Sequence, residues 1–248
     1  MADPAVWNFA VLLVEAKLAP QEVAAYAAAQ QRQVREHFAP AWQLPATTTV
    51  RVITDRAQAA PGEVVVYLHD DVTPGSPAGA LAYHTQEPDG TPACHVFCGL
   101  AEKCFEVWTK ASSHEVLETL GDPRVRRCVE VLTDGSIWDV EVCDRVEQDQ
   151  YPIDGVLLSN FCTPECFEPP DSPPPGTKYD YMGLCTSPNQ VRPGGYAQKY
   201  VPGTGWSQVG QMSEYRGTLA DAGIGRIVRR EARNPAPRPW WRRLLGLK

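Results

Sequence analysis

Apolar residues in the first part of the chain follow strand-like and helix-like spacings in turn. The run Trp7–Glu15 is almost continuously apolar and has the length of a strand, which predicts a strand buried within a mixed or parallel sheet. The β-branched runs Thr47–Thr54 and Glu63–Leu68 predict two more strands. An alanine-rich segment over residues 20–38 predicts a helix that ends before Pro40. This order of elements is typical of a layered body in which helices cover a sheet.

Turn signals organise the middle of the chain into hairpins. The runs Leu81–Thr85 and Ala93–Phe97 flank an Asp-Gly turn, which predicts a hairpin. Asp-Gly pairs at residues 134–135 and 154–155 predict two further turns of this kind. The segment Trp138–Glu147 carries four acids among apolar residues, and its pattern fits either a strand or a helix. The two choices group the acids differently, so the sequence leaves their arrangement open.

Residues 109–123 predict one amphipathic helix with a well-marked end, because a glycine and then a proline follow its last turn. Its apolar side consists of Ser113, Val116, Leu117 and Leu120. Its other side carries four ionisable residues, His114, Glu115, Glu118 and Asp122. A surface helix with no site would show the same division into an apolar and a polar side.

The ionisable side of this helix also has the spacing of a metal site. His114 and Glu118 are four residues apart, so their side chains lie one above the other. This is the geometry of the H-E-x-x-H zinc helix, with glutamate in place of the second histidine. In that arrangement His114 and Glu118 are ligands, and Glu115 is the general base that takes a proton from the activated water.

A catalytic zinc ion needs a third protein ligand, which must come from outside this helix. We expect Glu141, in the acidic segment, to supply it. Asp144 is either an alternative ligand or the carboxylate that orients the histidine. Asp122 is a more remote alternative ligand, and its position beside Pro123 favours the role of a helix-end residue.

Composition limits the classes of function. The 248 residues are 43% hydrophobic and 21% charged, as in an ordinary globular protein. The net charge is −7, and the body of the chain has no basic stripe, which argues against nucleic acid as a partner. No run approaches the roughly 18 apolar residues of a membrane span, and the start lacks a signal-peptide pattern. We therefore expect a cytoplasmic or virion-associated protein.

The eight cysteines are even in number, but a chain of this size does not need disulfides to fold. We expect reduced thiols. The alternative is a protein with a few disulfides, in which Cys162 with Cys166, and Cys128 with Cys143, are the pairs to test.

The composition changes toward the C-terminus. We expect an α/β domain over residues 1–208, with a proline-rich loop at 163–176 that wraps around it, then a helix over 209–233. The last segment, 234–248, is proline-rich, basic and amphipathic. It is predicted to be an anchor to a partner protein or a membrane surface, unless its tryptophans pack back on the domain. The anchor residues are Trp240, Trp241, Arg242 and Arg243.

The order of elements, with H-E-V-L-E at residues 114–118, resembles the zincin metallopeptidase fold. The downstream Glu141-Val-Cys-Asp144 is similar to the second glutamate motif of the gluzincin branch. The resemblance implies an α+β fold: a zincin-like mixed sheet with an N-terminal helix and an active-site helix, followed by a loop-rich C-terminal part. It also implies His114 and Glu141 as zinc ligands, Glu115 as the base, and a peptide or protein as substrate.

The chain departs from that family at one ligand, because Glu118 stands where the family has its second histidine, and the downstream motif is spaced differently. One imidazole and two carboxylates make a harder, more anionic site. Such a site holds Zn²⁺ less tightly and suits Mn²⁺ or Ca²⁺ better.

A second resemblance covers most of the chain. The stretches WNFAVLLVE, SHEVLE, EVCD and GLCTSPNQVRPGGYA look like an uncharacterised group of bacterial and phage-encoded proteins. This likeness implies a phage or virion context, and it does not indicate any particular activity. Two hypotheses follow, a metal-dependent peptidase and a catalytically inactive zincin-like structural or adaptor protein with virion proteins as partners.

Overall fold

The computed structural model describes residues 6–77, 79–131 and 134–210, and it has the predicted α+β class. Its main sheet has five strands in the order β2-β1-β3-β5-β4. Neighbouring strands run parallel, except that β4 is antiparallel to β5. The strands are β1 (Phe9–Leu13), β2 (Val50–Ile53), β3 (Val64–His69), β4 (Ala82–Gln86) and β5 (Pro92–Phe97). The strands predicted from apolar runs are confirmed.

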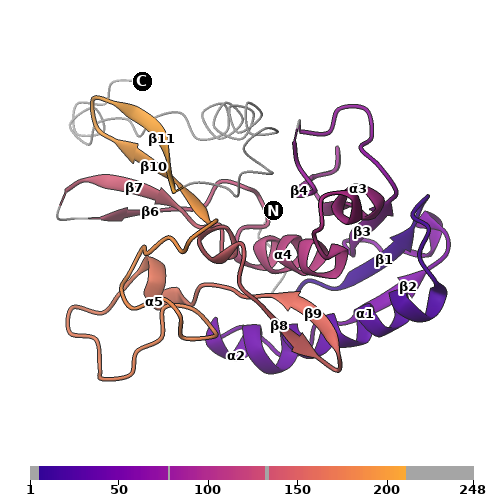
Figure 1. Ribbon diagram of the computed structural model, residues 1–248, viewed down its shortest axis with the longest axis horizontal. Coiled ribbons are helices and arrows are strands. Elements are labelled where there is room, and N and C mark those ends of the chain that lie inside the picture. The colour runs from indigo at the N-terminus through magenta and orange to yellow at the C-terminus, as the bar shows by residue number, and fades with distance from the viewer. Residues whose placement is uncertain (1–5, 78, 132–133, 211–248) are drawn as a thin grey trace.

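One face of this sheet carries the core of the molecule. Alternate residues of the parallel strands, such as Phe9, Val11, Val64 and Val66, point to this face and are buried with the helices. Helix α1 (Pro20–Arg32) packs on β2, and α4 (Trp108–Gly121) packs on β4 and β5 (Figure 1). The intervening residues form a smaller cluster on the opposite face: Ala10, Leu12, Ile53 and Val65. The two helices therefore form one layer that covers the same face of the main sheet.

The first helical segment extends further than predicted. After α1 it continues as a π-helix, η1 (Gln33–Phe38), and a short turn, α2 (Ala39–Ala41). The prediction that it ends before Pro40 is wrong. The amide of Ala39 bonds to the carbonyl of Val34, five residues back. Pro40 then occupies the first turn of a new helical segment, where its missing N–H costs nothing.

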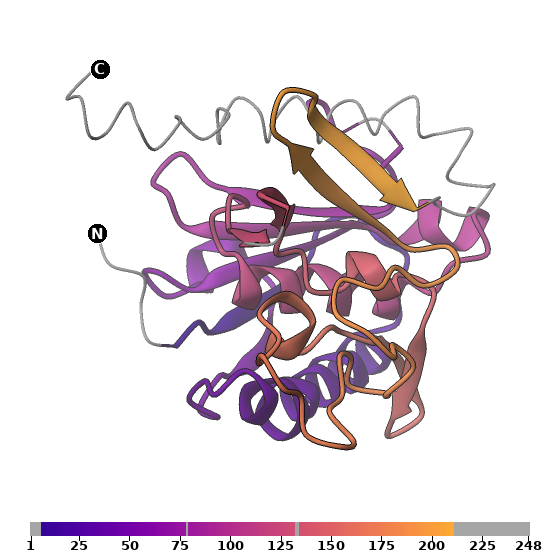
Figure 2. The same ribbon diagram turned by 90° about the vertical axis from the view of Figure 1, so that its left-hand side faces the viewer.

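The second half of the chain adds two smaller sheets. Strands β6 (Cys128–Val131), β7 (Ser136–Asp139), β10 (Tyr196–Val201) and β11 (Gly205–Gly210) form an antiparallel sheet in the order β11-β10-β7-β6. Figure 2 shows the β10–β11 hairpin at the opposite side of the molecule from α1. The hairpin of β8 (Gln150–Ile153) and β9 (Val156–Ser159) packs against α4.

The Asp-Gly turns occur where the sequence predicts them. In the β8–β9 hairpin, Asp154 and Gly155 both have left-handed backbone angles, with φ of 50° and 81°. This is the conformation that two-residue hairpin turns require and that Asp-Gly pairs favour. The proline-rich loop begins with the short helix α5 (Pro164–Phe167) and is exposed over most of the residues that follow.

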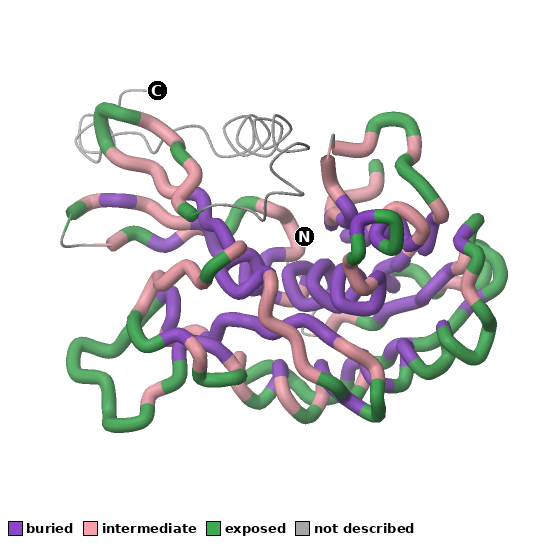
Figure 3. Tube along the Cα trace, in the orientation of Figure 1, coloured by how far each residue is buried: buried purple, intermediate pink, exposed green. Residues whose placement is uncertain are grey.

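Helix α4 lies at the centre of the molecule rather than on its surface (Figure 1, Figure 3). Every residue from Trp108 to Thr119 is buried, including the polar side. Strand β9 runs along one side, where Ser113 Oγ accepts a hydrogen bond from the Ser159 amide at 2.6 Å. On the sheet side, Thr119 Oγ1 lies 3.3 Å from Cys94 Sγ. The surface-helix interpretation is therefore wrong.

All eight cysteines lie within the described residues and are free thiols, so neither pair of the disulfide alternative is joined. Over that same part of the chain, every helix falls short of the length and apolarity that a bilayer crossing demands. The predicted helix at 209–233 falls almost wholly outside the described residues. The tail at 234–248, with its anchor residues Trp240, Trp241, Arg242 and Arg243, lies outside them altogether.

Candidate metal centre

Seven ionisable side chains meet around α4, and none of them is more than 7% exposed. They come from three segments of the chain: the edge strand β4, helix α4, and the acidic segment after β7. We call them the α4 cluster, which consists of His84, His114, Glu115, Glu118, Glu141, Asp144 and Glu147. Because ionisable groups are rarely buried without partners or a ligand, the geometry of this cluster decides what it does.

The acidic segment begins with the last two residues of β7, Trp138 and Asp139, and the rest of it neither continues that strand nor forms an α-helix. After β7 it is irregular, and it then forms one turn of 3-10 helix, η3 (Asp144–Val146). The fully buried guanidinium of Arg145 lies 3.3 Å from the Asp139 carboxylate and donates to the Asp139 carbonyl at 3.0 Å. These contacts close the segment into a compact turn that brings Asp144 and Glu147 to the side of α4.

A glycine at the end of α4 allows the acidic segment to come this close. A Cβ atom added at Gly121 would lie 2.5 Å from Val142 Cγ1. Any larger residue would push the acidic segment away from the helix. The Gly that the sequence marks as a helix terminator therefore also permits the close packing that builds the cluster.

The first group of potential ligands surrounds His114. Its Nε2 atom lies 2.9 Å from Glu118 Oε1 and 3.2 Å from Asp144 Oδ1. His114, Glu118 and Asp144 can each offer one ligand atom such that the three lie within 4.8 Å of one another, close enough to share one metal ion. On the other side of the ring, Nδ1 lies 3.2 Å from Glu147 Oε2. A carboxylate behind a metal-binding histidine fixes its tautomer and orientation, and Glu147 has that position.

The second group surrounds His84, which projects from β4 toward α4. Its Nδ1 atom lies 3.1 Å from Glu115 Oε2 and 3.4 Å from Glu118 Oε2. Its Nε2 atom lies 3.9 Å from Glu141 Oε2. The atoms that His84, Glu115 and Glu118 offer also lie within 4.8 Å of one another. Glu118 therefore belongs to both groups and presents a different oxygen to each imidazole.

The carboxylates change the protonation of both imidazoles. Burial alone would lower the pKa of His114, but the nearby Glu118, Glu147 and Asp144 raise that pKa well above its ordinary value. Burial would also lower the pKa of His84, and Glu115, Glu118 and Glu141 reverse that effect in the same way. Burial would raise the pKa of Glu118, yet the two imidazoles hold it well below its usual range.

The first group has the arrangement of side chains that could hold a cation. Within the described part of the chain, neither His114 Nε2 nor Glu118 Oε1 has a well-aligned hydrogen bond, although the two atoms are 2.9 Å apart. When His114 is neutral, its Nε2 and the Glu118 Oε1 are two buried lone-pair donors, and a cation placed between them could bind to both. Nitrogen and carboxylate oxygen ligands are accepted by several divalent cations.

The predicted site residues are brought together to different degrees. His114, Glu115 and Glu118 share the cluster with Glu141 and Asp144, as the site hypothesis requires. Asp144 takes the third position around His114, whereas Glu141 lies beside the other imidazole.

Asp122 is in neither group. Its carboxylate accepts the Arg127 amide at 2.7 Å, so Asp122 stabilises the turn that ends α4.

Sequence reasoning missed two members of the cluster. His84 lies opposite Cys94 in the β4–β5 pair, on the sheet face that α4 covers. Strand alternation could have placed it on that face, but not beside a particular helix. Glu147 follows Asp144 by three residues, and this helical spacing was the signal that both could reach one histidine.

Comparison with known proteins adds no assignment. No family model matches this chain, and neither a curated protein nor a solved structure matches it at a significant level. The chemistry of the α4 cluster is therefore the basis on which a function can be assigned.

Proposed function

We propose that this protein is a divalent-cation-dependent hydrolase that cleaves peptide bonds. The observation that carries the proposal is that His114, Glu118 and Asp144 are buried together, with Glu118 Oε1 and Asp144 Oδ1 at 2.9 and 3.2 Å from His114 Nε2. These atoms come from two segments that are distant in sequence, and such convergence is typical of a metal centre. The H-E-x-x-E pattern at 114–118, similar to the zincin signature, supports the same assignment.

Each residue has a distinct task in this proposal. His114, Glu118 and Asp144 hold the cation, and Glu147 keeps the His114 ring in its ligand orientation. A bound divalent cation would polarise the scissile carbonyl and lower the pKa of a water molecule. Glu115 follows the histidine ligand directly and accepts the proton of that water, then passes it to the leaving amine.

His84 holds the Glu115 carboxylate at 3.1 Å, which restricts the directions from which that carboxylate can accept a proton. Because two of the three ligands are carboxylates, the site is harder than the His-rich zinc site that it resembles. Zn²⁺ is the first candidate cation, and the oxygen ligands also favour Mn²⁺ or Ca²⁺.

The proposal is tested by metal analysis and a cleavage assay on the full chain. Purified protein should contain a stoichiometric divalent cation, measured by inductively coupled plasma mass spectrometry. Cleavage of an unstructured protein substrate should stop in Glu115→Gln while the cation content stays at the wild-type level. The control is Glu130→Gln, which removes an equal charge from the exposed side of β6. Activity that survives in Glu115→Gln would refute the assigned base.

The second candidate is a catalytically inactive scaffold with a structural cation, such as a virion component. The observation that favours it is the burial of every ligand, since a catalytic cation needs a route for its substrate. A structural cation would be present at full stoichiometry without any cleavage. Removing this cation with a chelator would then lower the melting temperature, and there would be no cleavage activity for the chelator to inhibit.

A further inference from the structure

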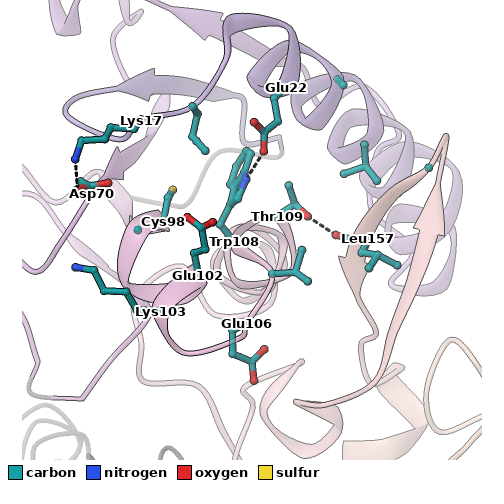
Figure 4. A pocket seen from close by; sticks show the side chains of 16 residues that line it. Lys17, Glu22, Asp70, Cys98, Glu102, Lys103, Glu106, Trp108, Thr109 and Leu157 are labelled. Atoms are coloured by element: carbon teal, nitrogen blue, oxygen red, sulfur yellow. Dashed lines mark hydrogen bonds and ion pairs between the residues drawn. The ribbon is translucent and has the colours of Figure 1, made fainter.

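A cavity of about 770 Å³ opens where the parallel strands of the main sheet end (Figure 4). Lys17 follows β1, Asp70 follows β3 and Cys98 follows β5, and all three line it. The chain runs from β1 to β2 on one side and returns to β3 on the other, so this edge is a switch point in the strand order. Ligands of open α/β sheets bind at the carboxyl ends of the strands at such a point.

The wall of the cavity combines an aromatic surface with an excess of carboxylates. Trp108 is held as part of the wall, because its indole N–H donates to Glu22 Oε1 at 2.9 Å. The other apolar lining includes the aliphatic side chains of Leu18, Ala25, Val107, Val156 and Leu157. Four carboxylates and two lysines complete the lining: Glu22, Asp70, Glu102, Glu106, Lys17 and Lys103.

Each of the two lysines in the lining is largely exposed and lies within ion-pair distance of an aspartate. Lys17 lies 3.7 Å from Asp70, and Lys103 bonds at 3.0 Å to Asp71, a residue outside the lining. Glu106 is paired with the buried Lys110 at 2.6 Å. Among the described residues, no ion pair is found for Glu22, which accepts the Trp108 indole N–H, or for Glu102, and both side chains are exposed. The cavity is therefore complementary to a positive group with an apolar stem.

The cavity lies at the start of the helix that carries the metal centre. Trp108 is the first residue of α4 and precedes His114 by six residues, which is about 9 Å along the helix axis. An extended peptide advances about 3.3 Å per residue, so this separation corresponds to about three residues of substrate. Lys110, His114 and Glu118 are spaced four apart and continue along the helix as one buried polar stripe.

We propose that this cavity binds a guanidinium or primary ammonium group on an aliphatic chain, as in an arginine or lysine side chain of a peptide. The aliphatic stem lies along Trp108, and the charged end is held by Glu22 and Glu102. As a substrate subsite the cavity rests on the proposed function, because it then selects basic peptides for the metal centre. As a binding site for a basic side chain, the cavity depends only on the residues that line it and not on the proposed function.

Binding is tested by titration calorimetry on the full chain with Glu115→Gln, so that turnover does not interfere. The probes are the acetylated, amidated pentapeptide Gly-Gly-Arg-Gly-Gly and its citrulline analogue, which has the same shape without the charge. The arginine peptide should bind about tenfold more tightly, as expected for one charge-assisted hydrogen bond at a partly exposed site. Adding Glu102→Gln should remove most of this preference, and adding Glu130→Gln should leave it intact.

A fluorescence titration places the peptide within the cavity. The arginine peptide should change the tryptophan emission, and Trp108→Phe should abolish that change. Equal affinity for both peptides, no binding of either, or a preference that survives Glu22→Gln with Glu102→Gln would overturn the proposal. If the arginine preference holds and no peptide is ever cleaved, the binding site stands and the proposed hydrolase fails. If peptides are cleaved without a preference for basic residues, the hydrolase stands and the subsite fails.

Discussion

Replacing Glu118 by glutamine removes one negative charge from between two buried imidazoles while keeping the shape of the side chain. Glu118 is 1% exposed, and its two oxygens lie 2.9 Å from His114 and 3.4 Å from His84. Removing one partner of a buried charge pair typically costs about 3–5 kcal/mol. We take the lower end, about 3 kcal/mol, because both imidazoles can release their protons once the carboxylate is gone.

The loss is measurable as a shift in thermal unfolding of the cation-free protein. For a chain of this length, 1 kcal/mol corresponds to about 2–4 °C, so Glu118→Gln should lower the melting temperature by about 6–12 °C. A cation at one hundred times its dissociation constant stabilises the folded state by about 2.7 kcal/mol. The wild-type melting temperature should therefore rise by about 5–11 °C on adding the cation, and the variant should show little of this rise.

The assay is circular dichroism melting after dialysis against a chelator, repeated with Zn²⁺, Mn²⁺ and Ca²⁺ in turn. Glu130→Gln should match the wild type with and without cation, because its side chain is exposed on β6. The prediction is refuted by a wild-type melting temperature that does not change on adding any of the three cations. It is refuted equally by a Glu118→Gln protein that gains as much stability from a cation as the wild type does.

Four further predictions follow from the structure. Glu147→Ala should weaken cation binding about 10–100-fold in a titration, and Glu147→Gln should restore part of the affinity, because it can still accept from His114 Nδ1. Cation affinity should rise with pH in titrations from pH 5 to 8, because His114 must release its proton to bind and its pKa is raised. In cation-free protein, the raised pKa values of His84 and His114 should stabilise the folded state fully below about pH 6.5, the pKa of histidine in the unfolded chain. This stabilisation should be lost as the pH rises through the pKa values of the two histidines in the folded protein, as measured by urea unfolding. Leu117→Ala, on the apolar side of α4, should cost about 2–5 kcal/mol of unfolding free energy while leaving the cation stoichiometry unchanged.

The elements that could be predicted are those whose signal is local. The run at Trp7–Glu15 specifies a buried strand by its own composition, and the Asp-Gly pair at 154–155 specifies a turn by its own backbone preference. Helix α4 is also locally specified, from its periodicity to its terminating glycine. The short helix α3 (Cys98–Lys103) has no such signal, and the sequence did not predict it.

The acidic segment could not be predicted because distant contacts decide its shape. Its pattern allows a strand or a helix, and the buried pair of Arg145 with Asp139 imposes a turn that is neither. That turn decides that Asp144 and Glu147, rather than Glu141, face His114. The place of His84 in the cluster could not be predicted for the same reason, because it depends on which helix covers strand β4.

The polar side of α4 explains why proton and cation should compete for one place. Buried carboxylates need positive charge nearby, and without a cation the imidazoles of His84 and His114 provide it by remaining protonated. A divalent cation between His114 and Glu118 brings two positive charges to the position of one proton, and the histidine must then be neutral. Glu118 and Asp144, which help to raise the pKa of His114, are thus also the carboxylates that would bind the cation.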